Sequence, residues 1–330
     1  MTGENQGFEI FNDQSVLITG GTGSFGRAFA DRLLKDSTAT RIVIFSRDEL
    51  KQFEMSSSYN GDSRLRFFLG DVRDRDRLYR AFDGADIVVH AAALKQIPAA
   101  EYNPFEFVNT NILGAQNIID AAIDRRVKKV IALSTDKASS PVNLYGATKL
   151  VSDKLFVAGN SYSGAKDTQF AVVRYGNVLG SRGSVIARLR ELTNGDTFYL
   201  TDERMTRFWI TIDQATAFVA RSIEAMAGGE IFVPKLPSMK LMDVVTAIAP
   251  DATIEHMGLR PGEKLHEEMI SADDAHRTID RGDYYVISPS IDWEGQRKIA
   301  GERVAQDFEY SSDTNADWLD RDGLVDLLNA

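Results

Sequence analysis

The sequence predicts an α/β protein in which a doubly wound parallel sheet is followed by a smaller, irregular C-terminal lobe. Three observations lead to this fold class. Short apolar runs alternate with helical stretches in the first part of the chain, a glycine-rich loop follows the first run, and the alternation loosens near residue 180. Apolar strands that alternate with amphipathic helices form a parallel sheet covered on both faces.

The elements of the first part follow one another in chain order. Residues 15–19 form an apolar run that ends in glycines, which predicts a buried strand. Phe29, Leu33 and Leu34 recur at helical spacing and predict a helix over 27–35. The later elements are a long helix over 109–125 and strands at 41–45, 66–69, 87–90, 129–133 and 170–174. Residues 1–180 are therefore predicted to be a Rossmann-type dinucleotide-binding domain.

Residues 181–330 are predicted to form the smaller lobe, with some of its segments packed back on the sheet. The expected elements here are a turn at 180–183, a strand at 231–237 that ends in prolines, and a loop at 260–264 that leads into a helix. The end of the chain is acidic and contains Trp318 and Leu319, which predicts a mobile or docking tail.

Composition narrows the classes of function. The net charge of −10 over 330 residues argues against general affinity for nucleic acid or an anionic membrane surface. The chain has no cysteine, and its four histidines show no H-x-x-x-H spacing, so no metal site is expected. The polar N-terminus does not resemble a signal peptide, and no apolar run is long enough to cross a membrane. A cytoplasmic protein with no nucleic-acid or membrane partner is expected.

A glycine-rich loop follows the first predicted strand. Its glycines stand three residues apart and lie between a strand and a helix, where glycines allow a tight turn and close approach to a pyrophosphate at the helix N-terminus. The alternative is a glycine-rich turn without a ligand. The candidate cofactor contacts in this loop are Gly20, Thr22, Gly23, Ser24, Phe25 and Gly26.

The end of the second predicted strand bears on the choice of cofactor. Ser46 and Arg47 come first, and a guanidinium suits the 2′-phosphate of NADP, whereas Asp48 directly afterwards keeps NAD as the less favoured choice. Arg47 could equally be a plain solvated side chain. Small or acidic residues after the third and fourth strands extend the candidate cofactor site, although the alanines could be core packing alone. These are Asp71, Val72, Ala91, Ala92 and Ala93.

A tyrosine and a lysine stand four residues apart, at Tyr145 and Lys149, with Ser134 and Thr135 eleven and ten residues upstream of the tyrosine. A tyrosine with a pKa near 10 is a poor base, and an ammonium one helical turn away lowers that pKa. The hydroxyls of Ser134 and Thr135 can bind the same substrate oxygen. With the glycine loop, this set predicts oxidation of a sugar or alcohol hydroxyl, with Tyr145 and Lys149 also contacting the nicotinamide.

An adjacent acid and base, Asp136 and Lys137, lie beside this set, and simple oxidation needs neither. They predict oxidation coupled to a second reaction, in which Lys137 is neutral and Asp136 is protonated. Burial pushes both pKa values that way, whereas an ion pair between the two opposes it, and the sequence leaves that balance open. The alternative is a solvated or capping pair at a strand end.

At these residues the chain resembles the extended short-chain dehydrogenase/reductases that act on nucleotide sugars. Within them it is most similar to the inverting UDP-N-acetylglucosamine 4,6-dehydratases that begin pseudaminic acid synthesis. Related capsule-type and membrane-bound retaining dehydratases share Thr-Asp-Lys-Ala but typically carry Met in place of Tyr145. The resemblance runs from Gly20 to about Ser288, and its most specific segments are residues 46–52, 93–98, 134–138, 143–149 and 174–178.

The resemblance implies a mechanism and a product. Tyr145 takes the C4 hydroxyl proton as NADP takes the hydride, Lys137 removes the C5 proton, and Asp136 protonates the departing C6 hydroxyl. Hydride then returns to C6, and C5 is protonated from the opposite face. The implied product is UDP-2-acetamido-2,6-dideoxy-β-L-arabino-hex-4-ulose, made by a homo-oligomeric lyase of polysaccharide or flagellin glycan biosynthesis.

The resemblance also supplies candidate substrate contacts in the loops and in the nucleotide-sugar-binding lobe of residues 181–330. Each could instead be an ordinary salt-bridge residue. Two other functions stay open. A UDP-sugar 4-epimerase needs the Tyr–Lys pair and NAD but no Asp–Lys pair, and a non-catalytic NADP-binding sensor predicts a damaged Tyr–Lys pair. The substrate candidates are Lys95, Asn177, Arg207, Arg260 and Glu263.

Overall fold

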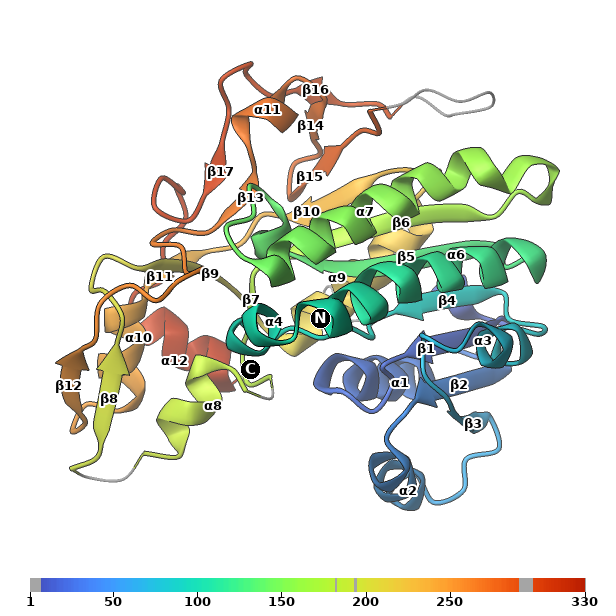
Figure 1. Cartoon of the computed structure of the whole chain (residues 1–330), viewed down its shortest axis with the longest axis horizontal. Helices are drawn as coiled ribbons and strands as arrows, with labels where there is room; N and C mark the ends of the chain where they lie inside the picture. Colours follow the sequence, from blue (N-terminus) through green and yellow to red (C-terminus); the bar gives the residue numbers. More distant parts are fainter. Residues whose placement is uncertain (1–6, 182, 193–194, 291–298, 330) are drawn as a thin grey trace.

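The computed structural model describes residues 7–181, 183–192, 195–290 and 299–329. Its centre is a ten-stranded sheet with the strand order β16-β14-β15-β10-β6-β5-β4-β1-β2-β3 (Figure 1). From β3 to β10 neighbouring strands run parallel, and β15, β14 and β16 add an antiparallel edge. This confirms the predicted α/β fold class.

The predicted strands of the first part are all present, most of them extended by a few residues. They are β1 (Ser15–Thr19), β2 (Arg41–Ser46), β3 (Leu65–Leu69), β4 (Ile87–His90), β5 (Lys129–Thr135) and β6 (Gln169–Tyr175). Parallel pairing places Thr19 opposite Phe45 and His90, and Thr135 opposite Tyr175. The carboxyl ends of these strands therefore meet along one edge, where ligands of doubly wound sheets bind.

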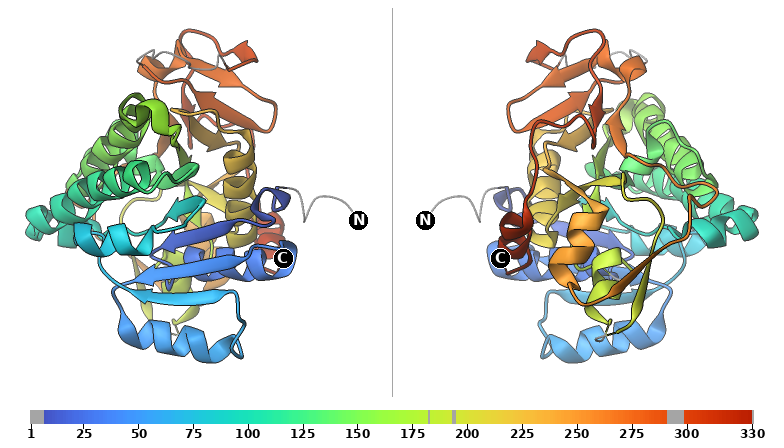
Figure 2. Two further views of the ribbon diagram at one scale, coloured as in Figure 1. Left: turned by 90° about the vertical axis from the view of Figure 1, so that its right-hand side faces the viewer. Right: turned by 90° about the vertical axis from the view of Figure 1, so that its left-hand side faces the viewer.

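Helices cover both faces of the sheet, as Figure 2 shows. One face carries α1 (Ser24–Asp36) and α9 (Ile212–Ala225), and the other carries α3 (Arg75–Ala81), α6 (Gly114–Asp124) and α7 (Leu144–Ser163). The predicted helix over 109–125 is in fact two elements, because a π-helical turn precedes α6. The remaining elements of this part are η1 (Glu9–Phe11), α2 (Glu49–Ser58), α4 (Ile97–Tyr102), α5 (Pro104–Phe107), η2 (Val108–Leu113), η3 (Asp136–Ala138) and η4 (Gly164–Lys166).

The rest of the chain contributes both to the sheet and to a separate lobe. Strand β10 (Ile231–Pro234) lies beside β6, while the lobe contains three small sheets and its own apolar cluster around Trp209 and Val244. Its elements are β7 (Asn177–Val178), α8 (Val185–Arg190), β8 (Thr197–Leu200), β9 (Thr206–Ile210), β11 (Ser238–Lys240), α10 (Leu241–Ile248), β12 (Thr253–His256) and β13 (Glu268–Ile270). Those that follow are α11 (Ala272–Ala275), β14 (Thr278–Asp280), β15 (Tyr284–Ile287), β16 (Glu302–Arg303), β17 (Tyr310–Ser311) and α12 (Arg321–Asn329). The domain boundary near residue 180 stays a prediction.

Two expectations for the C-terminal part were wrong in detail, whereas the docking alternative for the acidic tail agrees with the structure. The loop after Arg260 leads into strand β13 rather than a helix, and β10 ends at Pro234. The acidic tail is docked on the protein, because Trp318 forms a bridge with Ser238 and α12 packs on α10. Leu324 of α12 is fully buried in the lobe cluster, so apolar residues fix the tail despite its charge.

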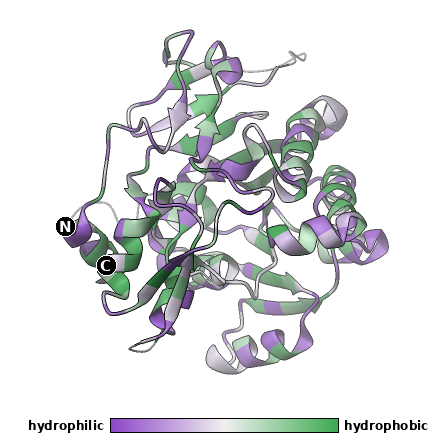
Figure 3. Cartoon of the chain, turned by 60° about the vertical axis from the view of Figure 1, so that its left-hand side comes forward, coloured by the Kyte–Doolittle hydropathy of each residue, from purple (hydrophilic) through white to green (hydrophobic). Residues whose placement is uncertain are grey.

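The distribution of hydropathy agrees with this layered arrangement. In Figure 3 the hydrophobic colour runs along the central strands, whereas hydrophilic segments are frequent in the outer helices and loops. Within the described part of the chain, no helix has both the length and the apolar character needed to cross a bilayer.

Candidate active site

A cavity of about 790 Å³ lies along the carboxyl edge of the sheet, with the lobe as its other wall. Every residue predicted to contact the cofactor or the substrate lines it, and so do Thr135 and Lys137. Asp136 has no exposed surface and lies just behind these two residues. The structure therefore brings the predicted site residues together, although it does not test the role of each.

The glycine loop forms a close-fitting cradle at one end of the cavity. Gly20 has a φ of +65°, and a Cβ there would lie 2.9 Å from the backbone of Ala92. A Cβ on Gly26 would lie 2.5 Å from Cα of Gly21. Only glycine fits at these two positions, and Gly23 is the N-cap residue of helix α1. The helix N-terminus thus has open backbone around it, as binding of a pyrophosphate requires.

The residues at the end of β2 contact both the cavity and the start of helix α2. Asp48 is used by the helix, because its carboxylate accepts from the Lys51 backbone N–H at 3.0 Å and pairs with Lys51 Nζ at 2.6 Å. Arg47 lines the cavity with a half-exposed side chain whose Nη1 lies 3.7 Å from Asp71 Oδ2. Ser46 Oγ lies 2.8 Å from Thr22 Oγ1. A guanidinium is thus available at this end, where the carboxylates of Asp48 and Asp71 also line the cavity but are engaged by the cap of α2 and by Arg73.

Helix α7 packs directly on the short helix η3, and this contact brings together the candidate catalytic residues. Asn143 caps α7 by accepting from the Gly146 N–H at 2.7 Å. Gly146 is required, because a Cβ there would lie 2.1 Å from the carbonyl oxygen of Lys137. The close approach brings Tyr145 beside Thr135, to which its hydroxyl is hydrogen-bonded.

The pKa values of the Tyr–Lys pair differ from the sequence-based expectation. Burial raises the pKa of Tyr145 to about 12, and the nearby Lys137 charge and the Thr135 hydrogen bond offset this only in part. Lys149 donates to the Leu133 carbonyl at 2.8 Å, and burial lowers its pKa against the opposing Asp153 charge. From the sequence we expect Lys149 to lower the pKa of Tyr145, but in the protein chain by itself the tyrosine pKa is raised.

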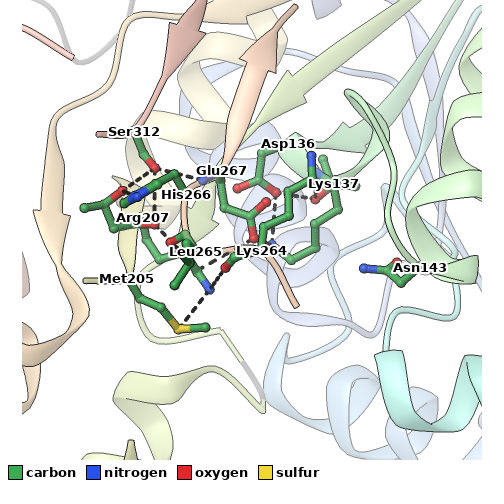
Figure 4. A network of polar contacts seen from close by, with 12 residues as sticks. Asp136, Lys137, Asn143, Met205, Arg207, Lys264, Leu265, His266, Glu267 and Ser312 are labelled. Carbon is green, nitrogen blue, oxygen red and sulfur yellow. Dashed lines mark hydrogen bonds and ion pairs between the residues drawn. The ribbon is translucent and has the colours of Figure 1, made fainter. Parts of the chain in front are cut away.

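Lys137 lies between two buried carboxylates, as Figure 4 shows. Its Nζ is 3.1 Å from Asp136 Oδ1 and 3.0 Å from Glu267 Oε1. Asp136 Oδ1 also accepts from the Thr135 hydroxyl at 2.8 Å. Burial would lower the pKa of Lys137, but the two carboxylates outweigh it and raise the pKa. The two carboxylates thus favour the ammonium form of Lys137 in this arrangement, and the pair lies at the cavity wall with only 20% of the lysine side chain exposed.

Three buried charged residues of this region were missed from the sequence: Glu267, Asp153 and Arg174. Ser134 lines the cavity and its Oγ donates to Asp153 Oδ2 at 2.8 Å, while its expected contact with a substrate oxygen stays a prediction. Arg174 Nη2 lies 3.3 Å from the same oxygen, and its Nη1 donates to the Met269 carbonyl at 2.9 Å. Glu267 follows the Arg-Pro-Gly-Glu-Lys loop but lies far from Lys137 in sequence, so no spacing rule could have paired them.

Removal of the Asp153 carboxylate should strongly destabilise the fold. The Asp153→Ala variant leaves Arg174, only 2% exposed in its side chain, without its counter-charge. Breaking a buried ion pair in this way costs about 3–5 kcal/mol, to be measured by chemical denaturation. Asp283→Ala, which breaks the exposed pair with Arg221, is the control and should cost much less. Equal losses in the two variants would contradict the structural role of Asp153.

The predicted substrate residues surround the far part of the cavity. Burial and the charge of Lys137 lower the pKa of Lys95. Arg207 donates to the carbonyls of Thr206, Leu265 and Lys264 at 2.7–3.1 Å, so most of its guanidinium is already engaged. Its role as a diphosphate clamp stays a prediction.

In the described part of the chain, Glu263 has a carboxylate oxygen without a hydrogen-bond partner, whereas the buried ring of His90 has one. Within the described residues, no donor reaches Oε2 of Glu263, which leaves an acceptor for a ligand hydroxyl at the cavity wall. His90 is buried with its Nδ1 2.7 Å from Thr19 Oγ1, and burial lowers its pKa to about 3. His90 is thus a packed structural residue. The described chain also contains no cluster of metal-ligating side chains.

Comparisons with known proteins agree with this geometry. Residues 16–289 match the family described as polysaccharide biosynthesis protein. The chain is 52% identical over 330 residues to the UDP-N-acetylglucosamine 4,6-dehydratase (inverting) of Campylobacter jejuni subsp. jejuni serotype O:23/36, covering 97% of this chain and 98% of the relative. It is 41% identical over 286 residues to the UDP-glucose 4-epimerase of Rickettsia prowazekii, covering 84% of each. Among solved structures, Pen from Bacillus thuringiensis superposes with a TM-score of 0.89 at 35% identity, covering 97% of this chain and 98% of Pen.

Proposed function

The chain belongs to the polysaccharide biosynthesis protein family, and from that premise we propose that it is an inverting UDP-N-acetylglucosamine 4,6-dehydratase. The product would be UDP-2-acetamido-2,6-dideoxy-β-L-arabino-hex-4-ulose. The observation that carries the proposal is the Asp136–Lys137 pair beside Tyr145, with Lys137 and Tyr145 in one cavity and Asp136 directly behind them, since oxidation alone needs no second acid and base. Water is lost without net oxidation, so the enzyme would be a lyase.

The cavity fits a nicotinamide dinucleotide, because the positions of Gly20 and Gly26 have no room for a side chain and leave the helix N-terminus open. When bound, this cofactor supplies the acceptor for the C4 hydride and returns that hydride to C6. We propose NADP rather than NAD. Support comes from Arg47, which lines the cavity, and from Asp48, whose carboxylate is occupied as the cap of α2.

The choice of cofactor can be tested at Arg47. Arg47→Ala should weaken NADP binding about tenfold, the lower end of what one hydrogen bond to a charged group contributes, because this side chain is half-exposed. NAD lacks the 2′-phosphate, so its affinity should hardly change and serves as the internal control. Titration calorimetry with both dinucleotides measures the difference. Parallel weakening of both would argue against a 2′-phosphate contact.

The protein's own residues would divide the reaction between them. Tyr145, hydrogen-bonded to Thr135, would take the proton of the C4 hydroxyl. The resulting ketone acidifies C5, from which Lys137 on the cavity wall would take a proton. Asp136 would supply the proton that leaves with the C6 hydroxyl, and because it is fully buried behind Thr135 and Lys137, it must act along its contacts with them or shift toward the cavity.

A UDP-sugar 4-epimerase is the second candidate, favoured by the Rickettsia relative. It would oxidise and reduce C4 and would have no use for a base held against C5. The intact Tyr145–Lys149 pair counts against a non-catalytic sensor. Three further attributes follow from the resemblance and stay proposals: a cytoplasmic location, a homo-oligomeric state, and a place in pseudaminic acid or related surface-glycan synthesis.

Incubation with UDP-N-acetylglucosamine in deuterated water, followed by mass spectrometry and proton NMR, tests the proposal. Loss of one water with deuterium at an inverted C5 is the expected result. Water loss with the C5 configuration kept would make the enzyme a retaining dehydratase. Formation of the C4 epimer without water loss would make it an epimerase, and either result would reject the proposed function.

A further inference from the structure

Glu267 is a buried acid that the mechanism above leaves without a task. It lies just before β13, is 2% exposed, and places Oε1 3.0 Å from Lys137 Nζ. Arg207 Nε lies 3.7 Å from the same oxygen. Within the described residues no hydrogen-bond donor reaches its second oxygen, Oε2. A second carboxylate against the proposed base is expensive to bury, so its presence calls for a reason.

The backbone of Glu267 is held in place by the C-terminal part of the chain. Its N–H donates to Ser312 Oγ at 2.9 Å, and its carbonyl accepts from the Ser312 N–H at 2.8 Å. The Ser312 hydroxyl also lies 2.7 Å from Thr206 Oγ1, which in turn lies 2.8 Å from His266 Nδ1 (Figure 4). The carboxylate is therefore held against Lys137 by a backbone segment just before β13 that is hydrogen-bonded on both sides of Glu267 to Ser312.

The two carboxylates at Lys137 differ in how well their negative charge is satisfied. Asp136 Oδ1 accepts hydrogen bonds from both Lys137 and the Thr135 hydroxyl. Glu267 receives Lys137 at 3.0 Å but Arg207 only at 3.7 Å. Each carboxylate also has one oxygen, Asp136 Oδ2 and Glu267 Oε2, that no hydrogen-bond donor reaches within the described residues. Asp136 must also hold its own proton for the departing hydroxyl, which leaves Glu267 to receive the one on Lys137.

We propose that Glu267 is a positioning residue for Lys137 that takes the lysine proton and so releases the neutral amine that removes the C5 proton. In this step an N–H bond of Lys137 breaks, its electron pair stays on nitrogen, and an O–H bond forms on Glu267. The inference rests on the proposed function, since it assigns Glu267 to the dehydration step. Glu267 acts through Lys137 and does not touch the substrate.

The charged and titratable groups around Lys137 determine how the rate should depend on pH. Besides Asp136 and Glu267, these are Arg207 on β9, Lys95 in the loop after β4, and Tyr145 on α7. Both carboxylates raise the pKa of Lys137, whereas Arg207 lowers it. Removal of the Glu267 charge therefore lowers the lysine pKa, and it also removes the internal acceptor. In Glu267→Gln the proton must leave to solvent, so the neutral amine accumulates only as pH rises.

The test uses wild type and Glu267→Gln with UDP-N-acetyl-6-deoxyglucosamine, which can be oxidised at C4 but has no C6 hydroxyl to lose. Absorbance of the reduced nicotinamide follows C4 oxidation, and NMR in deuterated water follows exchange at C5. We expect C4 oxidation to change little in Glu267→Gln. Exchange at C5 should fall about a hundredfold near neutral pH and recover as pH rises, whereas the wild-type exchange rate stays level.

Two control variants separate this role from a structural one. Glu268→Gln alters the neighbouring acid, which accepts from Ser139 and Ser140 instead of Lys137, and it should behave as wild type. Glu267→Asp keeps a carboxylate and should keep a level pH profile at a reduced rate. Wild-type exchange in Glu267→Gln, or a loss of C4 oxidation and C5 exchange together at every pH, would overturn the inference.

Dehydration of UDP-N-acetylglucosamine by the same two proteins distinguishes a failure of the proposed function from a failure of the role of Glu267. If wild type fails to dehydrate UDP-N-acetylglucosamine, the proposed function falls and the inference falls with it. If wild type dehydrates that substrate and Glu267→Gln matches it at every pH, only the role of Glu267 is rejected.

Discussion

Lys137→Met should remove water elimination while oxidation at C4 continues. Methionine is similar in length but has no amine. Because Lys137 is the group held between Asp136 and Glu267, the variant has no base at this position to remove the C5 proton of the 4-keto sugar. Loss of a general base slows a step by roughly 10²–10⁴-fold. The dehydrated product, measured by its mass, should form at that reduced rate, while the 6-deoxy analogue is still oxidised at C4.

A lysine elsewhere on the chain provides the matched control for this variant. Lys166 is exposed and pairs with Asp124 at the protein surface, so Lys166→Met should dehydrate its substrate as wild type does. Substantial dehydration by Lys137→Met would remove Lys137 as the base. Loss of C4 oxidation in Lys137→Met would mean that the substitution disturbs Tyr145, whose pKa the lysine charge lowers.

The sheet could be predicted from the sequence because each of its strands leaves a local pattern in the amino-acid sequence. Each of the first six strands is an apolar run bounded by turn residues, and burial in a parallel sheet demands this pattern. The cofactor cradle was predictable for the same reason, since the glycines, the strand and the helix follow one another directly. The comparisons confirm the predicted family and its function class.

The missed parts of the site depend on contacts between distant segments. Glu267 meets Lys137 only after β13 pairs with β17, and Arg174 meets Asp153 only when α7 packs on β6. The tail is a similar case, because its acidic composition concealed Leu324, which the lobe buries. No local pattern carries such pairings.

The pKa of Tyr145 shows a different limit of the sequence-based argument. Spacing to Lys149 correctly placed the two residues one helical turn apart, but it could not weigh burial, which raises the tyrosine pKa to about 12. Lys149 itself is bonded to the Leu133 carbonyl. Identifying a catalytic pair from spacing is thus easier than predicting its protonation.

Tyr145→Phe should have the opposite effect to Lys137→Met. The ring is nearly buried and packs with Ala100 and Phe107, so phenylalanine should keep the fold while removing the hydroxyl that takes the C4 proton. We expect C4 oxidation to fall by roughly 10²–10⁴-fold. No ketone then forms, so dehydration of UDP-N-acetylglucosamine should fall by the same factor. Absorbance of the reduced nicotinamide with the 6-deoxy analogue measures the loss.

Supplying the ketone directly distinguishes the role of Tyr145 from the role of Lys137. When the 4-keto form of the 6-deoxy analogue, which keeps the C5 configuration of the substrate, is added in deuterated water, Tyr145→Phe should still exchange the C5 proton, because Lys137, Asp136 and Glu267 are unchanged in it. Lys137→Met should fail to exchange the same compound although it oxidises C4. If Tyr145→Phe lost C5 exchange on the supplied ketone as well, Tyr145 would be needed for both steps. The division of labour between a tyrosine that oxidises and a lysine that eliminates would then be wrong.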